Sequence, residues 1–404
     1  MSISLRKYIF VVLGIIAISF SCSDDGISND TNDDSTYQDI IDPVLKINLS
    51  ALPDYANQDV PNYITRDNTN GNPITDEGAT LGRVLFYDKN LSVDNSIACA
   101  TCHKQEIAFA DTGRFSEGIN GFTERTSMRL VNNRFSEEFR YFWDERAISL
   151  EEQSILPIQD HIEMGFTGEN GNPGFPELIL KLESLEYYKV LFEITFGDEM
   201  ITRERMQLAL SQFVRSIQSF DSKYDEGRAM VQSDGPDFPN FTEAENKGKD
   251  LFMRHTQFNM QGVRVSGGVA CAICHQPPEF SIVPDSKNNG NLFVEDQNSD
   301  LDLTNTKSPS LRDFLDKNGN INGGFAMHNG AFNSVNEVLE HYNEIPDSFQ
   351  GHVFGSIDQR LKAFNNPQKL NMTAIEKQQL IAFLKTLTGQ DVYINEKWSD
   401  PFKD

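Results

Sequence analysis

The sequence predicts an all-helical protein made of two similar halves. Its 404 residues provide material for about two domains of roughly 100–200 residues each. Apolar residues recur near helical spacing in several stretches, whereas the alternation typical of strands is rare. A weak internal repeat and two copies of one cysteine–histidine motif mark the halves. The hydrophobic share of 38% and the 29 phenylalanines are enough for packed cores, so the chain as a whole is not disordered.

The predicted helices have apolar residues near helical spacing and cover residues 177–196, 203–219, 243–254, 334–342 and 373–387. Three runs rich in Gly, Asn and Asp are predicted as loops, at 67–72, 169–173 and 288–302. The run 233–240 contains Gly235, Pro236 and Pro239, which disfavour a continuous helix. We therefore place a boundary there, between a first domain of residues 46–238 and a second of residues 239–404.

The internal repeat consists of a Glu, a Gly and a Phe at the same spacing in both halves. Its members are Glu77, Gly82 and Phe86 in the first half and Glu243, Gly248 and Phe252 in the second. A Gly and a Phe four residues apart lie on one face of a helix, where the small residue lets another helix approach closely. Each set precedes one copy of the cysteine–histidine motif, so the repeat predicts two units of one design.

The chain begins with the features of an export signal. Arg6 and Lys7 form a positive start, and the apolar stretch at 8–20 is too short for a membrane span. Residues 1–21 are therefore predicted as a signal peptide. Cys22 follows a Ser-Phe-Ser sequence that resembles a bacterial lipoprotein box. This predicts lipidation of Cys22 and anchoring to the outer membrane, on its periplasmic or outer face; ordinary signal cleavage nearby is the alternative.

An acidic segment follows the signal. Between Ser23 and Leu45 there are seven Asp and no Lys or Arg. Such a composition cannot bury a core, so residues 22–45 are predicted as a disordered stalk. The formal net charge of -25 argues against nucleic acid as a partner.

The cysteine–histidine motif is Cys-x-x-Cys-His. In this motif both thiols add to the vinyl groups of a haem, and the His supplies one axial nitrogen to the iron. A zinc site is disfavoured because neither motif has a second cysteine pair nearby. The motifs use four of the five cysteines and Cys22 is the fifth, so no structural disulfide is expected. The residues predicted to bind haem c are Cys99, Cys102 and His103 in the first half and Cys271, Cys274 and His275 in the second.

Five other histidines are candidates for a second axial ligand to either iron. Each one alone is more often a satisfied surface or core residue than a ligand. They are His161, His255, His328, His341 and His352.

The chain from about Asp76 to Leu387 resembles the bacterial di-haem cytochrome c peroxidase and MauG family. The resemblance lies in several short segments that occur in one order, at 81–88, 142–146, 150–153, 157–158, 163–165, 308–312 and 327–330. It implies two class I cytochrome-c-like domains, each with one covalently bound haem c. It also implies hydrogen peroxide as a substrate.

The resemblance implies that the first haem is the peroxidatic site. Glu163 matches the distal Glu of the family, Gln153 and Pro157 match positions beside the distal pocket, and Trp143 matches the tryptophan between the two haems. A carboxylate there can take a proton from peroxide and return it to the leaving oxygen. Outside this context a lone Glu is usually solvated and a lone Trp usually belongs to a core. His161 either donates to peroxide or faces solvent.

The loop after the first motif bears on the resting state. In one branch of the family a histidine in this loop blocks the peroxidatic iron until the enzyme is reduced. This chain has no histidine between Lys104 and Trp143. We therefore predict that the first haem is open at rest and needs no reductive activation.

The second haem would store and pass on electrons, and its sixth ligand divides the family. Peroxidases use Met and MauG-like members use Tyr, fourteen residues after the position matched by His328. That position is Tyr342 here, and Met327 is the rival because a thioether is a common haem ligand. A phenolate lowers the reduction potential, whereas a thioether raises it.

The predicted function is a di-haem cytochrome c peroxidase with a small cytochrome c or cupredoxin as electron donor. One alternative is a MauG-like oxidase that acts on a partner protein through a high-valent two-haem state. The other is a non-enzymatic di-haem electron carrier, which would have no use for Glu163. A calcium ion between the domains is usual in the family, although residues 323–325 replace its usual Thr-x-Pro. The sequence leaves the calcium ligands and a homodimer open.

Overall fold

The computed structural model describes residues 31–137, 140–282, 286–291, 304, 306–307, 309–345, 348–349, 352–353 and 357–403. The predicted signal peptide and Cys22 lie outside these residues. Within them, no helix combines the length and the apolar character needed to cross a membrane.

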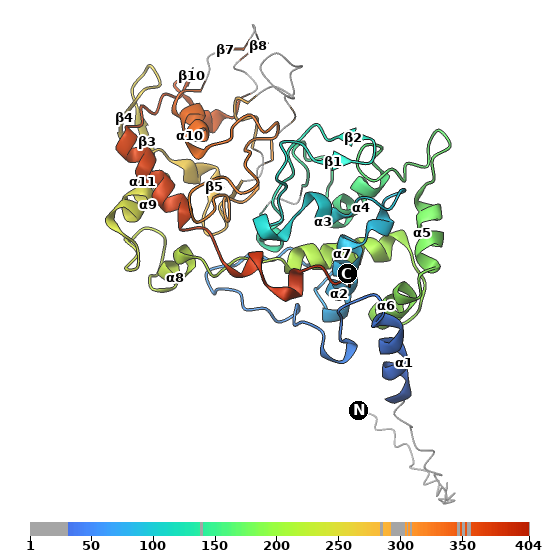
Figure 1. Ribbon diagram of the computed structural model, residues 1–404. Helices are drawn as coiled ribbons and strands as arrows, with labels where there is room; N and C mark the ends of the chain where they lie inside the picture. The colour runs from blue at the N-terminus through green and yellow to red at the C-terminus, as the bar shows by residue number, and fades with distance from the viewer. Residues whose placement is uncertain are drawn as a thin grey trace, which may run out of the picture.

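The described part of the chain is mostly helical (Figure 1). Its α-helices are α1 Thr31–Ile41, α2 Asp76–Tyr87, α3 Cys99–Cys102, α4 Leu150–Gln159, α5 Phe175–Glu183, α6 Glu186–Phe196, α7 Arg203–Ser216, α8 Lys223–Ala229, α9 Glu243–Met253, α10 Val335–Asn343 and α11 Ala374–Lys385. Side chains of Thr or Ser cap many of them; Thr242 and Thr373, for example, accept hydrogen bonds from the backbone at the starts of α9 and α11.

The strands form two-stranded antiparallel sheets. The pairs are β1 Glu117–Gly118 with β2 Gly121–Phe122, β3 Thr256–Phe258 with β4 Arg264–Gly267, β5 His275–Gln276 with β6 Ser281–Ile282, β7 Ser348–Phe349 with β8 His352–Val353, and β9 Lys362–Ala363 with β10 Asn366–Pro367. The β5–β6 pair sets His275 opposite Ile282. The all-helical prediction is therefore confirmed for the main framework and misses these short hairpins.

Four of the five predicted helices correspond to single helices, and the fifth is divided. The predicted helix at 177–196 is broken between α5 and α6, because Leu185 is extended and forms the N-cap of α6. Leu182 and Tyr188 are both fully buried on either side of the break. The break lets both helices bury apolar residues, which spacing alone does not reveal. The predicted loops at 67–72 and 169–173 are loops, and 288–302 lies partly outside the described residues.

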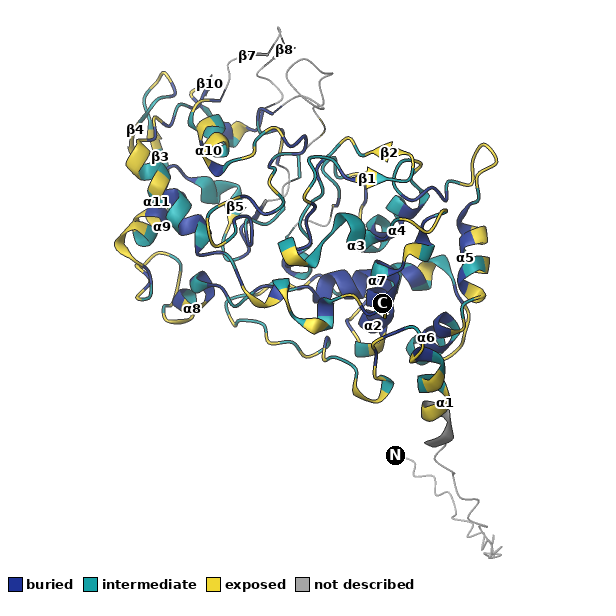
Figure 2. Cartoon of the chain, in the orientation of Figure 1, coloured by how far each residue is buried: buried dark blue, intermediate teal, exposed yellow. Residues whose placement is uncertain are grey.

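The internal repeat corresponds to two matching helix crossings. A Cβ atom on Gly82 would overlap the carbonyl oxygen of Ala209 in α7, and one on Gly248 would overlap the carbonyl oxygen of Gln379 in α11. Only glycine permits each backbone approach. Helices α2 and α7 are largely buried (Figure 2).

Phenylalanines stack at the same place in both crossings. The ring centroids of Phe86 and Phe213 are 5.1 Å apart, and those of Phe252 and Phe383 are 5.2 Å apart. The repeated Gly and Phe thus do the same work in each half, as the sequence predicts.

Two hydrophobic cores fill the halves, but they do not divide at the predicted boundary of residues 238 and 239. Tyr224 and Phe238 belong to the second core, whereas Val392 and Trp398 return to the first. The correction has a physical cause: α8 packs its apolar side into the second core before the Pro-rich run, and the chain end after α11 crosses back. Composition marked a loop, which is not the place where the cores separate.

The acidic stalk predicted over residues 22–45 is wrong at its C-terminal end. Residues 31–41 form α1, and Ile41 and Leu45 are fully buried. Tyr37 and Ile40 also pack against the first core, so one face of α1 is apolar. Leu45 pairs with Phe402 near the chain end. The apolar residues among the aspartates therefore dock this segment.

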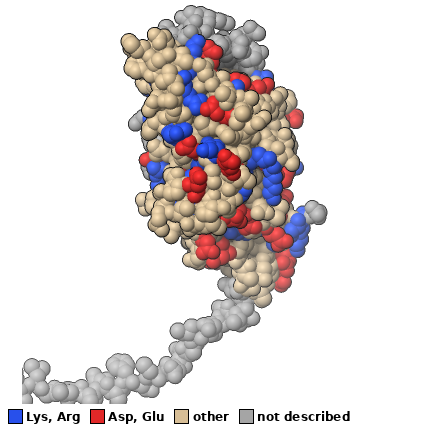
Figure 3. Space-filling model, turned by 90° about the vertical axis from the view of Figure 1, so that its left-hand side faces the viewer, with Lys and Arg blue, Asp and Glu red and all other residues tan. Residues whose placement is uncertain are grey.

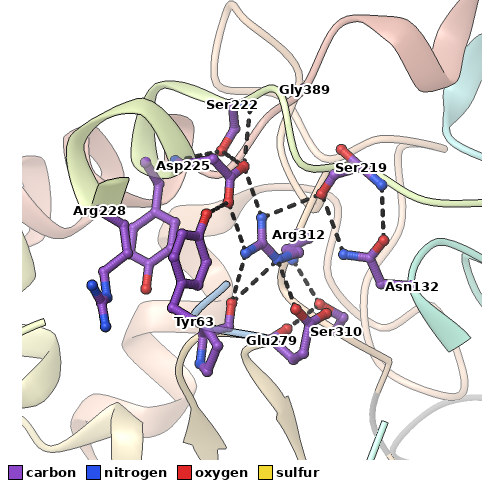
Figure 4. Close-up of polar contacts among 12 residues, drawn as sticks. Tyr63, Asn132, Ser219, Ser222, Asp225, Arg228, Glu279, Ser310, Arg312 and Gly389 are labelled. Atoms are coloured by element: carbon purple, nitrogen blue, oxygen red, sulfur yellow. Dashed lines mark hydrogen bonds and ion pairs between the residues drawn. The ribbon is translucent and has the colours of Figure 1, made fainter. Parts of the chain in front are cut away.

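A buried charge cluster joins the two halves (Figure 4). Arg312 is fully buried, and its guanidinium lies 3.0 Å from the carboxylate of Asp225. It also donates to the carbonyl oxygens of Ser219 and Pro278, at 3.3 and 2.8 Å. Tyr63 donates to Asp225 at 2.8 Å. A buried charge that is both paired and hydrogen-bonded holds its neighbours in one arrangement, which fixes the halves relative to each other.

Candidate active site

The first of two cavities surrounds the first Cys-x-x-Cys-His motif. Cys99, Cys102 and His103 line it together with residues of α4, and its volume is about 510 Å³. Neither cysteine forms a disulfide. Burial raises the pKa of the Cys99 thiol to about 12.

The second cavity surrounds the second motif and is smaller, at about 130 Å³. Cys271 and His275 line it, together with residues of α10 and α11. Cys274 completes the motif as a free thiol. Burial raises the pKa of Cys271 to about 12.

Both motif histidines are oriented in the same way. The Nδ1 atom of His103 lies 3.0 Å from the carbonyl oxygen of Phe109, and that of His275 lies 3.2 Å from the carbonyl oxygen of Phe280. A neutral imidazole that donates from Nδ1 leaves Nε2 free as a ligand. Burial lowers the pKa of both rings, that of His275 to about 4, so both are neutral at physiological pH.

The cavities fit haem and do not fit zinc. Among the described residues, no group of three or more His, Cys, Asp or Glu side chains is arranged to hold a metal ion. Each motif instead brings thiols and one imidazole to a cavity with many apolar side chains. These include Phe86, Leu150 and Val214 in the first cavity and Phe252, Leu339 and Leu380 in the second.

Glu163 lies in the wall of the first cavity, shortly after α4. Asp160 ends that helix, and its carboxylate accepts the backbone N–H groups of Ile162 and Glu163, at 2.8 and 3.0 Å. This turn fixes the position of Glu163. Burial and the charge of Asp160 raise the pKa of Glu163 to about 7, although the positive charge of Arg146 opposes the shift. The carboxyl can therefore both accept and release a proton near neutral pH.

The predicted neighbours of Glu163 differ in whether they line the first cavity. Gln153 and Pro157, one turn apart on α4, line the first cavity as the resemblance implies. His161 is exposed and does not line it. Of the two roles that the sequence leaves open for His161, the solvent-facing one therefore agrees with the structure.

Trp143 lines both cavities. Its indole N–H donates to the carbonyl oxygen of Thr126 at 2.7 Å. Its own carbonyl oxygen accepts the N–H groups of Thr306 and Lys307, at 3.0 and 3.1 Å. The ring is thus held between a segment of the first half and a segment of the second.

The second cavity contains both candidates for the sixth ligand. Tyr342 and Met327 line it, and the side-chain N–H of Asn289 reaches both. The nitrogen lies 3.0 Å from the Tyr342 hydroxyl and 3.3 Å from the Met327 sulfur. Burial raises the pKa of Tyr342 above its ordinary value, so a phenolate there would need a cation such as iron to stabilise it.

Among the histidines whose side chains the structure describes, only His103 lines the first cavity. His328 is buried in the second cavity, 6.3 Å from the Trp143 ring between centroids. The Nε2 atom of His341 lies 3.0 Å from the carbonyl oxygen of Asn289, and His255 is exposed. The side chain of His352 lies outside the described residues.

Comparisons with known proteins agree with this geometry. Residues 76–232 match the family model of di-haem cytochrome c peroxidase. The chain is 29% identical over 328 residues to the methylamine utilization protein MauG of Methylophilus methylotrophus, covering 79% of this chain and 84% of that protein. It is 25% identical to cytochrome c551 peroxidase of Nitrosomonas europaea, covering 78% and 81%. Over most of its length the chain therefore resembles di-haem cytochrome c peroxidases and MauG proteins.

Solved structures extend the family likeness to the fold. A MauG-like protein associated with microbial copper homeostasis has a TM-score of 0.63 at 26% identity, covering 85% of this chain and 99% of that one. A variant of the di-haem peroxidase BthA from Burkholderia thailandensis has a TM-score of 0.61 at 19% identity, over 87% and 96%. The proteins that the chain resembles include both cytochrome c peroxidases and MauG proteins, and this likeness supports an oxidoreductase with two haem cofactors.

Three residues of these cavities escape prediction from the sequence. Asn289 bridges the two ligand candidates, Arg146 influences Glu163, and Arg129 lines both cavities. Arg146 carries a signal, since it belongs to the resembling segment at 142–146. The other two lie in loops, where the sequence has no periodicity to show which way a side chain points.

Proposed function

We propose that the protein is a di-haem cytochrome c peroxidase, which reduces hydrogen peroxide to water with electrons from a small cytochrome c or cupredoxin. One observation carries the proposal. Glu163, with a pKa near 7, lines a roomy cavity around His103 that has no second histidine among its described lining residues. This places an acid–base group in the wall of the cavity that would hold the first haem, where peroxide would react.

Two covalently attached haem c groups are part of the proposal. Cys99, Cys102 and His103 would hold the first, and Cys271, Cys274 and His275 would hold the second. When bound, the haem groups supply the redox chemistry that passes two electrons to peroxide.

Glu163 handles the protons of the reaction. Its carboxylate takes a proton from one peroxide oxygen and gives it to the other, so that the second oxygen leaves as water. Two electrons and two protons convert one hydrogen peroxide into two waters. Gln153 is a polar neighbour on the same wall and orients the substrate, whereas Pro157 shapes the cavity.

Trp143 forms the electron route between the cavities. Its hydrogen bond to Thr126 holds the indole in the shared wall. An aromatic ring at this place offers a polarizable path from the second cavity to the first. Tyr342 would help to hold the second haem by binding its iron, with Met327 as the alternative.

The second candidate function is a MauG-like oxidase that acts on a partner protein. Tyr342 favours it, because a phenolate lowers the reduction potential and makes the second haem a weaker acceptor of electrons from a donor protein. The likeness to MauG over most of the chain points the same way. A non-enzymatic carrier remains the third reading.

The outer face of the second half bears on the charge that an electron donor needs. Acidic and basic side chains are intermixed on it (Figure 3). Several are paired, such as Lys369 with Glu344 and Lys377 with Glu340. The large negative net charge is therefore not concentrated on this face, and donor docking there does not require a strongly basic partner.

The test is peroxide turnover by the protein carrying both haems, with reduced cytochrome c as donor. Rapid turnover supports the peroxidase. A long-lived oxidised state without turnover supports the MauG-like oxidase, and inertness supports the carrier. The resting electron-spin spectrum is expected to contain high-spin ferric haem, as an open first site requires.

The proposal includes export of the protein. Residues 1–21 would be the signal peptide, and Cys22 would carry the lipid that anchors the chain to the outer membrane. A calcium ion between the halves stays a prediction without assigned ligands, and so does a homodimer.

A further inference from the structure

The two cavities share one wall. Its members line both cavities, and they are Thr126, Ser127, Met128, Arg129, Trp143, Lys307 and Pro309. The proposed function uses Trp143 and gives no role to the two cations of this wall, Arg129 and Lys307; Arg129 is the one whose surroundings point to a ligand.

Arg129 is a half-buried cation without a paired anion among the described residues. Its guanidinium donates one hydrogen bond, to the carbonyl oxygen of Ser310 at 3.0 Å, and lies 5.2 Å from the ring centroid of Phe314. Its Nε–H is buried and has no hydrogen-bond acceptor. Within the described part of the chain, no carboxylate lies at ion-pair distance from it. The contrast with Arg312, which pairs with Asp225, is clear.

The charge of Asp313 acts on Arg129 but does not pair with it. The Oδ1 atom of Asp313 accepts hydrogen bonds from the Tyr393 hydroxyl and the Gly389 amide, both at 2.9 Å. Burial lowers the pKa of Arg129 to about 10, so the guanidinium is still charged at neutral pH. A positive charge that is largely removed from water and has no paired anion is costly, so a carboxylate brought by a bound group would stabilise it.

The groups that belong in these cavities bring such anions. Each haem carries two propionates, and a guanidinium binds carboxylates through parallel N–H donors. We propose that Arg129 binds haem propionates at the wall between the two cavities, and that its charge favours the reduced state of both haems. This inference rests on the proposed function in one respect only, the presence of both haems.

The experiment replaces Arg129 in the protein that carries both haems. Arg129→Gln keeps a polar side chain and removes the charge. We expect the equilibrium between reduced and oxidised haem to shift about tenfold toward the oxidised state in at least one haem, equal to a fall of 59 mV in a one-electron reduction potential. Arg254→Gln makes the same substitution at an exposed guanidinium outside both linings, and we expect it to leave both potentials unchanged.

Haem content is measured first, because it distinguishes a failure of the proposed function from a failure of the role proposed for Arg129. If the native protein does not bind two haems, the proposed function fails. If Arg129→Gln holds both haems at native potentials, the role of Arg129 is refuted while the proposed function stands.

Arg129→Lys covers the case in which the Gln variant does not fold. It keeps the charge and loses the paired donors. Infrared difference spectra between reduced and oxidised protein, with carbon-13 in the haem propionates, should show labelled carboxylate bands that move between native protein and Arg129→Lys. Bands that stay at the same frequencies would refute the proposed contact.

Discussion

The first half of the molecule places a carboxyl group, Glu163, in the wall of its cavity, whereas the second half places Tyr342 and Met327 in the equivalent space. Around these differences the two halves are built alike. Gly82 and Gly248 allow the same close helix crossing in each. The motif histidines are likewise fixed by the same kind of backbone hydrogen bond.

The difference indicates that a shared frame builds two similar cavities and that loop residues make their linings differ. The first cavity has a volume of about 510 Å³ and is lined by Glu163, whereas the second has a volume of about 130 Å³ and is lined by Tyr342 and Met327. Under the proposed function, the acid–base group lies in the half that would reduce peroxide, and the potential ligands lie in the half that would pass electrons. A substitution in one half should therefore change the properties of that half and leave those of the other half unchanged.

The largest effect should follow Glu163→Gln. The amide cannot accept the peroxide proton, so peroxide turnover should fall by about 10²–10⁴-fold while haem content and the second haem stay native. Steady-state turnover with reduced cytochrome c measures this. Glu169→Gln, at an exposed position in the loop before α5, is the control and should keep full activity. Retained turnover in Glu163→Gln would remove the acid–base role from this residue.

The pH profile should follow the same residue. Proton acceptance needs the carboxylate, and the pKa of Glu163 is raised to about 7. Turnover should therefore decline as the pH falls below 7, by up to tenfold per unit. For stability the sign is opposite: the raised pKa favours the protonated folded form at low pH, and that contribution is lost as the pH rises through 7. A flat turnover profile between pH 5 and 8 would contradict this assignment.

Substitutions in the second half should change a potential and leave the first cavity intact. Replacing a phenolate by a thioether in Tyr342→Met should raise the reduction potential of the second haem, on the order of 0.1 V. Met327→Leu should leave that potential nearly unchanged. Redox titration followed by absorbance measures both. The reverse pattern would make Met327 the ligand and would favour a more strongly oxidising second haem.

The sequence predicts the packed helices of the two halves better than the breaks between helices, the chain ends and the domain boundary. The repeat of Gly82 and Phe86 in the second half identifies α2 and α9 because close helix packing demands a small residue at a fixed place. The break at Leu185 and the docking of α1 through Ile41 depend on tertiary contacts that override local composition. The predicted boundary at residues 238 and 239 is wrong for the same reason. Trp398, near the C-terminus, packs in the core of the first half.

The site divides in a similar way. The haem motifs are contiguous in sequence and can be read directly, and the family resemblance adds Glu163 and Trp143. The resemblance does not decide between Tyr342 and Met327. In the structure both side chains lie within reach of one amide, that of Asn289. Such a meeting of loop residues depends on the folded chain and has no periodic signature.

A smaller effect is expected at the repeated glycines, where the two halves should respond alike. Gly82→Ala and Gly248→Ala each force a methyl group against the backbone of the crossing helix. We expect each to lower the free energy of unfolding by roughly 1–3 kcal/mol. Gly235→Ala, where a Cβ would meet only the Ser233 hydroxyl at 3.8 Å, should change it by less than about 0.5 kcal/mol. Thermal unfolding of the haem-loaded variants measures the difference, and a strong asymmetry between Gly82 and Gly248 would end the claim of one shared frame.

The smallest effect should be at His161, two residues before Glu163. Its side chain is exposed and lies outside the described lining of the first cavity, while the turn that positions Glu163 depends on Asp160. His161→Gln should therefore change peroxide turnover by less than about twofold, since substitutions at exposed positions away from special contacts have small effects. Asp160→Asn is the comparison. It weakens the acceptor for the Glu163 N–H and removes the charge that helps raise the pKa of Glu163, so it should shift the turnover profile to lower pH. A tenfold loss of peroxide turnover in His161→Gln would mean that His161 moves into the first cavity when peroxide binds. His161 would then share the catalytic role of Glu163.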